Sequence, residues 1–298
     1  MATPTPTIYF EPVLPFGGDC ENILSSTDAA PIVGADPATS IASADIDWRY
    51  PIETAGGIFC TWVGDDEHLE VVALPTESVP VELQQTYASA DCDVKYDWSE
   101  CALARTIGDV WVLASFLEGM EAPPVPREEL DAVLDIAASR AAAFASPEAV
   151  TRVGDTWDLP ECGDLASGLE LQTILGNAEI YEGLGTEGPG SPDKRIAVST
   201  GAMRECGWTT LEAPFAQLAV IIEPNAAWSF EAQRSRNPST EPVDVLGAGT
   251  AFRNLDGYSY EQDLLVTDSV NILQIGLSPS GDDVAVAAIA LRLLASSD

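Results

Sequence analysis

Histidine and lysine are nearly absent from this chain, which has one histidine, His68, and two lysines, Lys95 and Lys194, among its 298 residues. A Ser-His-Asp type triad in each half of the chain, or a metal site built from several imidazoles, needs more histidines than this. His68 follows an acidic turn, and we predict it to be an exposed loop residue. The sequence therefore predicts no catalytic residue and no metal ligand.

Basic charge is scarce as well, because 13 lysines and arginines stand against 48 acidic residues and give a formal net charge of -35. Such a charge repels nucleic acid and anionic lipid at long range. Nucleic acid is thereby excluded as a partner, whereas a cationic partner, a neutral ligand or a glycan stays open. An evenly spread acidic surface also confers solubility or salt tolerance without any binding role.

Long apolar runs and cofactor motifs are missing too. A membrane span needs about 20 apolar residues, and the run at 284–291 is ended by Arg292. Residues 183–188 match Gly-x-Gly-x-x-Gly, but prolines rather than a helix follow, so we predict a loop and no cofactor. Residues 1–7 are a Thr/Pro segment without the features of a signal peptide, which we interpret as the remnant of a stalk.

What the chain does have is an internal repeat. In each half a first cysteine is followed by a Cys-x-Trp segment and then by an apolar run, at Cys20, Cys60-Thr61-Trp62 and 69–75, and at Cys162, Cys206-Gly207-Trp208 and 218–224. A period of roughly 140 to 150 residues is the size of a domain rather than of a solenoid turn. We therefore predict two tandem domains, residues 8–148 and 149–298.

The six cysteines fall into pairs once the repeat is recognised, because its two copies have equivalent pairs and two cysteines are left over. The predicted bridges are Cys20–Cys60, Cys162–Cys206 and Cys92–Cys101. Three disulfides indicate an oxidising compartment and a protein that is extracellular or anchored to the cell surface. Two alternatives stay open: six reduced cysteines buried in a cytosolic protein, and a redox role for the last pair, whose spacing differs from Cys-x-x-Cys.

The order of predicted elements is the same in both copies. Short helices are expected at 20–24 and 162–175, strand hairpins at 57–62 with 69–74, 102–107 with 110–117 and 261–266 with 269–277, and closing helices at 126–145 and 281–294. Short turns such as Gly108-Asp109 make the paired strands antiparallel. The predicted fold class is α+β, with an antiparallel sheet flanked by an N-terminal and a C-terminal helix, present twice.

The helix-borne cysteine, the Cys-x-Trp strand and the C-terminal helix resemble a family of actinobacterial cell-surface lipoproteins of unknown function. The resemblance implies a PsbP-like α/β sandwich and a stalk that links the first domain to an anchor. The lipid-modified cysteine that such proteins carry just after the signal peptide is absent here, so a lipid anchor would lie outside these residues. The resemblance brings no catalytic residues.

Two segments contain candidate recognition residues, namely Lys95, Tyr96 and Trp98 in the first copy and Trp228, Arg234 and Arg236 in the second. Alternation along an extended chain shows both rings of the first segment on one side of a disulfide-closed loop. The alternative is that these rings fold back onto their own domain. The second segment is long and polar, and we predict a mobile loop. Trp62 and Trp208 are predicted to pack against the disulfides in the core.

The predicted function is an extracytoplasmic, non-enzymatic module that binds a small ligand or a cell-envelope protein. The alternative is a hydrolase that uses carboxylates in a site between the two domains, which requires at least one carboxyl of raised pKa.

Overall fold

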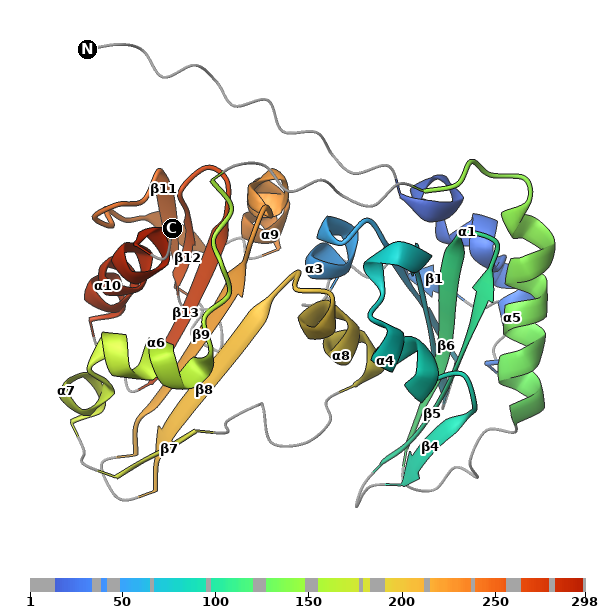
Figure 1. The fold of residues 1–298 in the computed structure, drawn as a ribbon, viewed down its shortest axis with the longest axis horizontal. Helices are drawn as coiled ribbons and strands as arrows, with labels where there is room; N and C mark the ends of the chain where they lie inside the picture. The colour runs from blue at the N-terminus through green and yellow to red at the C-terminus, as the bar shows by residue number, and fades with distance from the viewer. Residues whose placement is uncertain are drawn as a thin grey trace, which may run out of the picture. The chain divides into compact units, whose positions relative to one another are not determined.

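The computed structural model describes most of the chain, namely residues 14–33, 39–41, 49–64, 67–94, 98–119, 127–147, 155–176, 179–182, 191–211, 215–236, 239–255, 264–278 and 282–296. It has two antiparallel sheets with helices against them (Figure 1). By their contacts the residues form an N-terminal unit, Pro12–Val150 with Ser191–Thr200, and a C-terminal unit, Thr151–Gly190 with Gly201–Asp298. This grouping differs from the predicted ranges in Ser191–Thr200, which lie in the second repeat of the sequence.

The N-terminal sheet has six described strands in the order β1-β2-β3-β6-β5-β4, all antiparallel to their neighbours. The strands are β1 (Thr39–Ile41), β2 (Ile58–Val63), β3 (Glu67–Pro75), β4 (Asp91–Val94), β5 (Trp98–Ile107) and β6 (Val110–Gly119). The predicted hairpins β2–β3 and β5–β6 are confirmed. Gly108 has a φ of 62° in the turn between β5 and β6, a conformation that glycine adopts without strain.

Helices cover both faces of this sheet. They are η1 (Pro15–Gly18), α1 (Cys20–Ile23), α2 (Ser26–Ala29), α3 (Arg49–Thr54), η2 (Thr76–Ser78), α4 (Val81–Thr86), α5 (Arg127–Ala141) and α8 (Pro192–Ser199). On one face, Trp62 and Val112 are buried with Leu130 and Leu134 of α5, the predicted closing helix. This face has the core that the apolar spacing of α5 predicts.

The opposite face of the N-terminal sheet is covered by α3, α4 and α8 (Figure 1). It is buried but partly polar, because Thr61, Glu70 and Ser115 form one cross-strand row. Arg195 of α8 lies 5.5 Å from the ring centroid of Tyr87 and 3.9 Å from the carboxylate of Asp91. Aromatic and ionic contacts thus join α8 to the N-terminal unit.

The C-terminal sheet has seven described strands in the order β10-β11-β12-β13-β9-β8-β7, again all antiparallel. They are β7 (Ile180–Glu182), β8 (Arg204–Thr210), β9 (Gln217–Glu223), β10 (Thr240–Pro242), β11 (Thr250–Asn254), β12 (Leu264–Thr267) and β13 (Ile272–Ser278). The hairpin β12–β13 was predicted from its turn, and the strands β10 and β11 were not.

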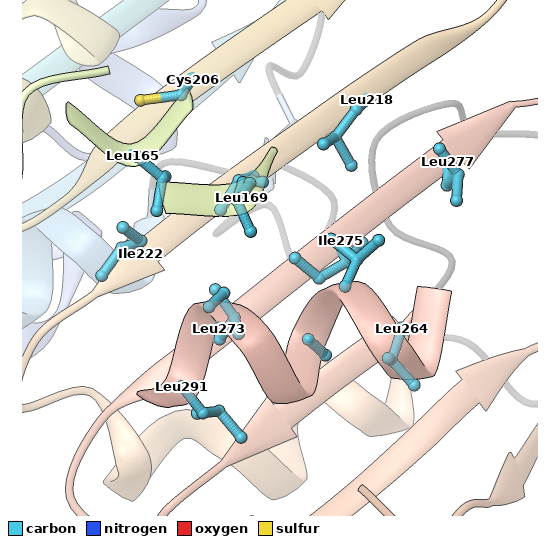
Figure 2. Packing of buried hydrophobic residues seen from close by; sticks show 14 of the residues in the cluster. Leu165, Leu169, Cys206, Leu218, Ile222, Leu264, Leu273, Ile275, Leu277 and Leu291 are labelled. Atoms are coloured by element: carbon cyan, nitrogen blue, oxygen red, sulfur yellow. The ribbon is translucent and has the colours of Figure 1, made fainter. Parts of the chain in front are cut away.

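The helices of the C-terminal unit are α6 (Cys162–Leu169), α7 (Leu171–Leu175), η3 (Ala227–Ser229), α9 (Phe230–Ser235) and α10 (Asp283–Ala295). Figure 2 shows Leu165 and Leu169 of α6 and Leu291 of α10 among the buried residues of β9, β12 and β13. The prediction of one helix over 162–175 is wrong, because Glu170 has a φ of 54° and separates α6 from α7. The turn at Glu170 lets Leu171 and Leu175 reach the same core as α6.

All six cysteines form the three predicted bridges, so the pairing is confirmed and the alternative of reduced cysteines is not supported. Cys20–Cys60 and Cys162–Cys206 each join a helix to a strand. Cys92 and Cys101 face each other in the register of β4 and β5, so their bridge clamps two paired strands. Trp62 and Trp208 are buried core residues as predicted. No described helix is long and apolar enough to span a bilayer.

Candidate functional site

Of the three candidate residues in the first copy, Trp98 is described by the structure. Lys95 and Tyr96 fall outside the described residues, so their predicted role is untested. Trp98 is the first residue of β5 and is paired with Gly119 of β6. The bridge between Cys92 and Cys101 clamps β4 to β5, and a recognition role for Lys95, Tyr96 and Trp98 stays a prediction.

The candidate residues of the second copy lie on and beside a helix. Trp228 is part of η3, Arg234 lies in the last turn of α9, and Arg236 follows that helix. The prediction of a mobile loop is wrong for residues 227–235. They are helical because Phe230 is buried with Ala226 and Ile272 and so ties the segment to β13.

Arg234 is engaged by its own unit. Its guanidinium carbon lies 4.9 Å from the ring centroid of Phe252, and a guanidinium nitrogen lies 2.8 Å from the carboxylate of Glu231. The cation is thus placed over an aromatic ring and paired with an acid. The positive charge of Arg234 is therefore matched within the C-terminal unit.

A buried polar network that the sequence did not indicate holds α9 against the sheet. Gln233 of α9 donates from Nε2 to Glu223 Oε2 at 2.9 Å and to Ser229 Oγ at 3.0 Å. Gln274 of β13 also donates from Nε2 to the carboxylate of Glu223, and the same Nε2 lies 3.3 Å from Gln233 Oε1. Because two amides hydrogen-bond this buried carboxylate, the network anchors the helix.

His68 lies in β3, opposite Val63 of β2, and is half-buried. Its place at the start of a strand agrees with the sequence, but the prediction that it is an exposed loop residue is wrong, since the strand begins at Glu67 and includes the histidine. Burial lowers the pKa of His68, so the imidazole is neutral at neutral pH. Its Nε2 has no hydrogen-bond partner within the described part of the chain.

Asp193, in the first turn of α8, is a carboxyl whose pKa is raised above its ordinary value. Its side chain is only 3% exposed, and burial raises the pKa, although Ser191 and the backbone of Lys194 donate hydrogen bonds that oppose the shift. One oxygen, Oδ1, has no hydrogen-bond partner among the described residues. Within the same residues, no three His, Cys, Asp or Glu side chains gather closely enough to hold a metal ion.

Replacing Asp193 with asparagine is expected to raise the melting temperature at neutral pH. An unfolded chain ionises this group above the ordinary pKa of 3.8, whereas the folded unit keeps the proton to a higher pH. The wild-type protein therefore loses stability as the pH rises through this window, and Asp193→Asn does not. Thermal unfolding followed across pH checks this, with the exposed Asp164→Asn of α6 as control. A gain that persists below pH 3.8 contradicts it.

A half-open pocket of about 250 Å³ lies in the N-terminal unit between the β5–β6 turn and the end of α5. We call it the α5 pocket, and its lining includes Phe16, Ile107, Asp109, Val110, Ala142 and Phe144. The hollow exists because the end of α5 and the residues after it present alanines, which leave the space of larger side chains unfilled.

Phe16 forms part of the wall of the α5 pocket through an unusual backbone conformation. Its φ is 53°, in a region that residues other than glycine seldom adopt. Asn22 fixes this turn by donating from Nδ2 to the Phe16 carbonyl at 2.9 Å. The ring of Phe16 then lies 5.7 Å from that of Phe144, centroid to centroid, at 56°. Such tilted pairs attract each other, and this pair closes one side of the pocket.

The rim of the α5 pocket has a defined polar group. The carboxylate of Asp109 accepts a hydrogen bond of 2.8 Å from Ser146 Oγ, and the Asp109 carbonyl accepts one of 2.8 Å from the backbone of Thr76. No sequence signal marked this site, because its residues come from separate segments whose approach depends on the fold. Chemically it offers apolar contact with a negative charge at the edge.

Comparison with known proteins gives no family for this chain. No family model matches it, and no curated protein does. Among solved structures, the crystal structure of the di-domain ARO/CYC StfQ from the steffimycin biosynthetic pathway is 10% identical over 91% of this chain and 86% of that chain. The TM-score of 0.16 is too low to indicate a shared fold. The function of the chain must therefore be inferred from its own geometry.

Proposed function

We propose that this protein is an extracytoplasmic, non-enzymatic binding module that takes one apolar side chain of a protein partner into the α5 pocket. The observation that carries the proposal is the pocket itself, with the apolar residues of its mixed lining and the paired rings of Phe16 and Phe144. The three disulfides support an oxidising compartment outside the cytoplasm.

The size of the α5 pocket favours a side chain over a free ligand. Pockets that enclose small-molecule ligands usually measure about 300 to 1,000 Å³, whereas an apolar cavity of about 150 Å³ holds benzene. A half-open volume of about 250 Å³ therefore suits one ring or one branched aliphatic group. Side chains of this kind are the usual anchors of protein interfaces.

We further propose that the chain belongs with the actinobacterial cell-surface lipoproteins that its Cys-x-Trp segments resemble, and that each unit is a PsbP-like sandwich. The support is that both copies place the second cysteine in a strand and bridge it to a helix. The hydrolase alternative requires a carboxyl of raised pKa, and Asp193 is such a group. Its burial leaves no access for a substrate, so we prefer a binding role.

Filling the α5 pocket is expected to abolish binding of apolar side chains. Ala142→Trp places a large ring in the hollow, and Ala143→Trp adds the same ring at an exposed neighbour that is not among the lining residues. The probes are the N-acetyl amides of phenylalanine and leucine, titrated while amide NMR signals are recorded. A single buried side chain contributes at most about 3 kcal/mol, so the dissociation constants should be millimolar or weaker.

The wild-type protein and Ala143→Trp should show saturable shifts for residues that line the pocket, and Ala142→Trp should show none. The amide of N-acetylserine, which has no apolar group to bury, should leave the signals unchanged. Equal shifts in the two tryptophan variants, or shifts that do not map to the pocket, would contradict the proposal.

A further inference from the structure

Three large apolar side chains are exposed at one corner of the C-terminal sheet. Leu211 is 60% exposed, Phe215 is 68% exposed and Tyr181 is 40% exposed. We call these three residues the β8–β9 tip. Single exposed apolar residues are common on proteins, but a group of them at one place marks an interaction surface more often than chance.

The pairing of β7, β8 and β9 brings these residues together. The last pair of the β8–β9 ladder is Thr209 with Gln217, and the Thr210 amide still donates to the Ala216 carbonyl at 3.0 Å. Leu211 directly follows Thr210 and Phe215 directly precedes Ala216, so both residues lie just beyond this contact at the end of the ladder. Tyr181 of β7 is paired with Thr209 on the other side of β8, so it lies beside the end of the same hairpin.

The three side chains lie outside the hydrophobic core of the unit. The neighbouring residues Ile180 and Ala216 contact the hydrophobic core, whereas the three residues of the tip are exposed. The Tyr181 hydroxyl donates a hydrogen bond of 2.7 Å to Glu179 Oε1. Its polar group is thus held in the unit while the ring stays accessible.

The charge around the β8–β9 tip is negative. Glu179 and Glu182 are exposed on either side of Tyr181, and no lysine or arginine occurs at 171–193 or 205–233. The whole chain has a net charge of -35. A second copy of this chain and an anionic bilayer are therefore repelled, whereas a cationic surface is attracted.

We propose that the β8–β9 tip is a docking surface for a basic protein. An apolar face of that partner covers Leu211 and Phe215, and lysine or arginine side chains beside that face pair with Glu179 and Glu182. The long-range charge speeds the encounter, and the apolar side chains supply most of the affinity. This surface is separate from the α5 pocket, and the two proposals stand or fall independently.

The experiment uses the whole chain and two peptide probes. One is a short amphipathic helical peptide of leucine and lysine, and the other has serine in place of every leucine. We expect the first to bind the wild-type protein at least about tenfold more tightly than the second, because only the first offers an apolar face. The double variant Leu211→Ser with Phe215→Ser should lose that difference in affinity. The double variant Glu179→Gln with Glu182→Gln should bind both peptides more weakly, and its binding should depend less on salt.

Leu246→Ser is the matched control, since Leu246 is 76% exposed in the same unit but outside the tip. It should bind both peptides as the wild-type protein does, and thermal unfolding should show all variants folded. Equal loss of binding in the control and the double serine variant would overturn the proposal. The proposal is also overturned if the wild-type protein binds phosphatidylcholine vesicles, or sediments as a dimer, and the double serine variant does not.

Discussion

Replacing Cys20 and Cys60 together with alanine is expected to lower the free energy of unfolding of the N-terminal unit by about 4 kcal/mol. The bridge spans a sequence separation of 40 residues, and without it the unfolded chain regains the freedom of that long loop. A loss of this size is a large part of the stability of an ordinary domain. Urea unfolding of the oxidised protein, with an amide signal followed in each unit, measures the loss.

The other two bridges are the controls for this experiment. Removing Cys162 and Cys206, which are 44 residues apart, should cost about 4 kcal/mol in the C-terminal unit and leave the N-terminal unit unchanged. Removing Cys92 and Cys101, only 9 residues apart, should cost about 3 kcal/mol. If removing the short-loop bridge and the long-loop bridge of the N-terminal unit lowered its free energy of unfolding equally, loop entropy would not be what these bridges contribute to stability.

Replacing Gly64 with alanine is expected to destabilise the N-terminal unit by about 3 kcal/mol, although it adds a single methyl group. An ideal Cβ at this position would lie 1.7 Å from the backbone oxygen of Val33 and 2.8 Å from its carbonyl carbon. Backbone cannot rotate away as a side chain can, so the chain after α2 or the end of β2 must move. Chemical denaturation of Gly64→Ala measures the cost.

Gly163→Ala is the matched control because a Cβ there meets nothing within 4 Å. Gly163 lies in the first turn of α6, where alanine favours the helix by about 0.5 to 1 kcal/mol over glycine. This variant should therefore be slightly more stable than the wild-type protein. If Gly64→Ala were as stable as Gly163→Ala, the close approach of Val33 would not be a feature of the folded protein in solution.

Local signals were sufficient to predict much of the fold. The hairpins follow from alternating strands with short turns such as Gly108-Asp109, and the bridges follow from the repeated spacing of Cys20 with Cys60 and Cys162 with Cys206. These predictions depend on residues close in sequence or on a comparison of the chain with itself. The shared α+β architecture and the two antiparallel sheets could thus be inferred without coordinates.

The elements that sequence reasoning missed depend on distant contacts. The short helix α3 begins at Arg49 and contains Pro51, and its side chains are mostly buried against other parts of the unit. Such a segment has little intrinsic helix tendency, and packing decides its conformation. Likewise α9 was expected to be a loop, because its helix depends on the packing of Phe230 and the hydrogen bonds of Gln233 with residues distant in the sequence.

The candidate site could not be predicted for the same reason. The wall of the α5 pocket combines Phe16, the turn at Asp109 and Phe144, which are far apart in the sequence. The left-handed backbone of Phe16 has no signature in its residue type. By contrast, the exposure of Leu211 and Phe215 could be predicted from the sequence. Buried residues alternate with less buried ones where β8 ends and β9 begins, and both residues continue this alternation on the exposed side.

The grouping of α8 with the N-terminal unit has a consequence for the history of the gene. Ser191–Thr200 belong to the N-terminal unit, although they stand in the sequence between two parts of the C-terminal unit. Neither unit is therefore one continuous stretch of coding sequence. A single recombination event cannot exchange the N-terminal unit intact, since it would leave behind the helix that contacts Tyr87 and Asp91.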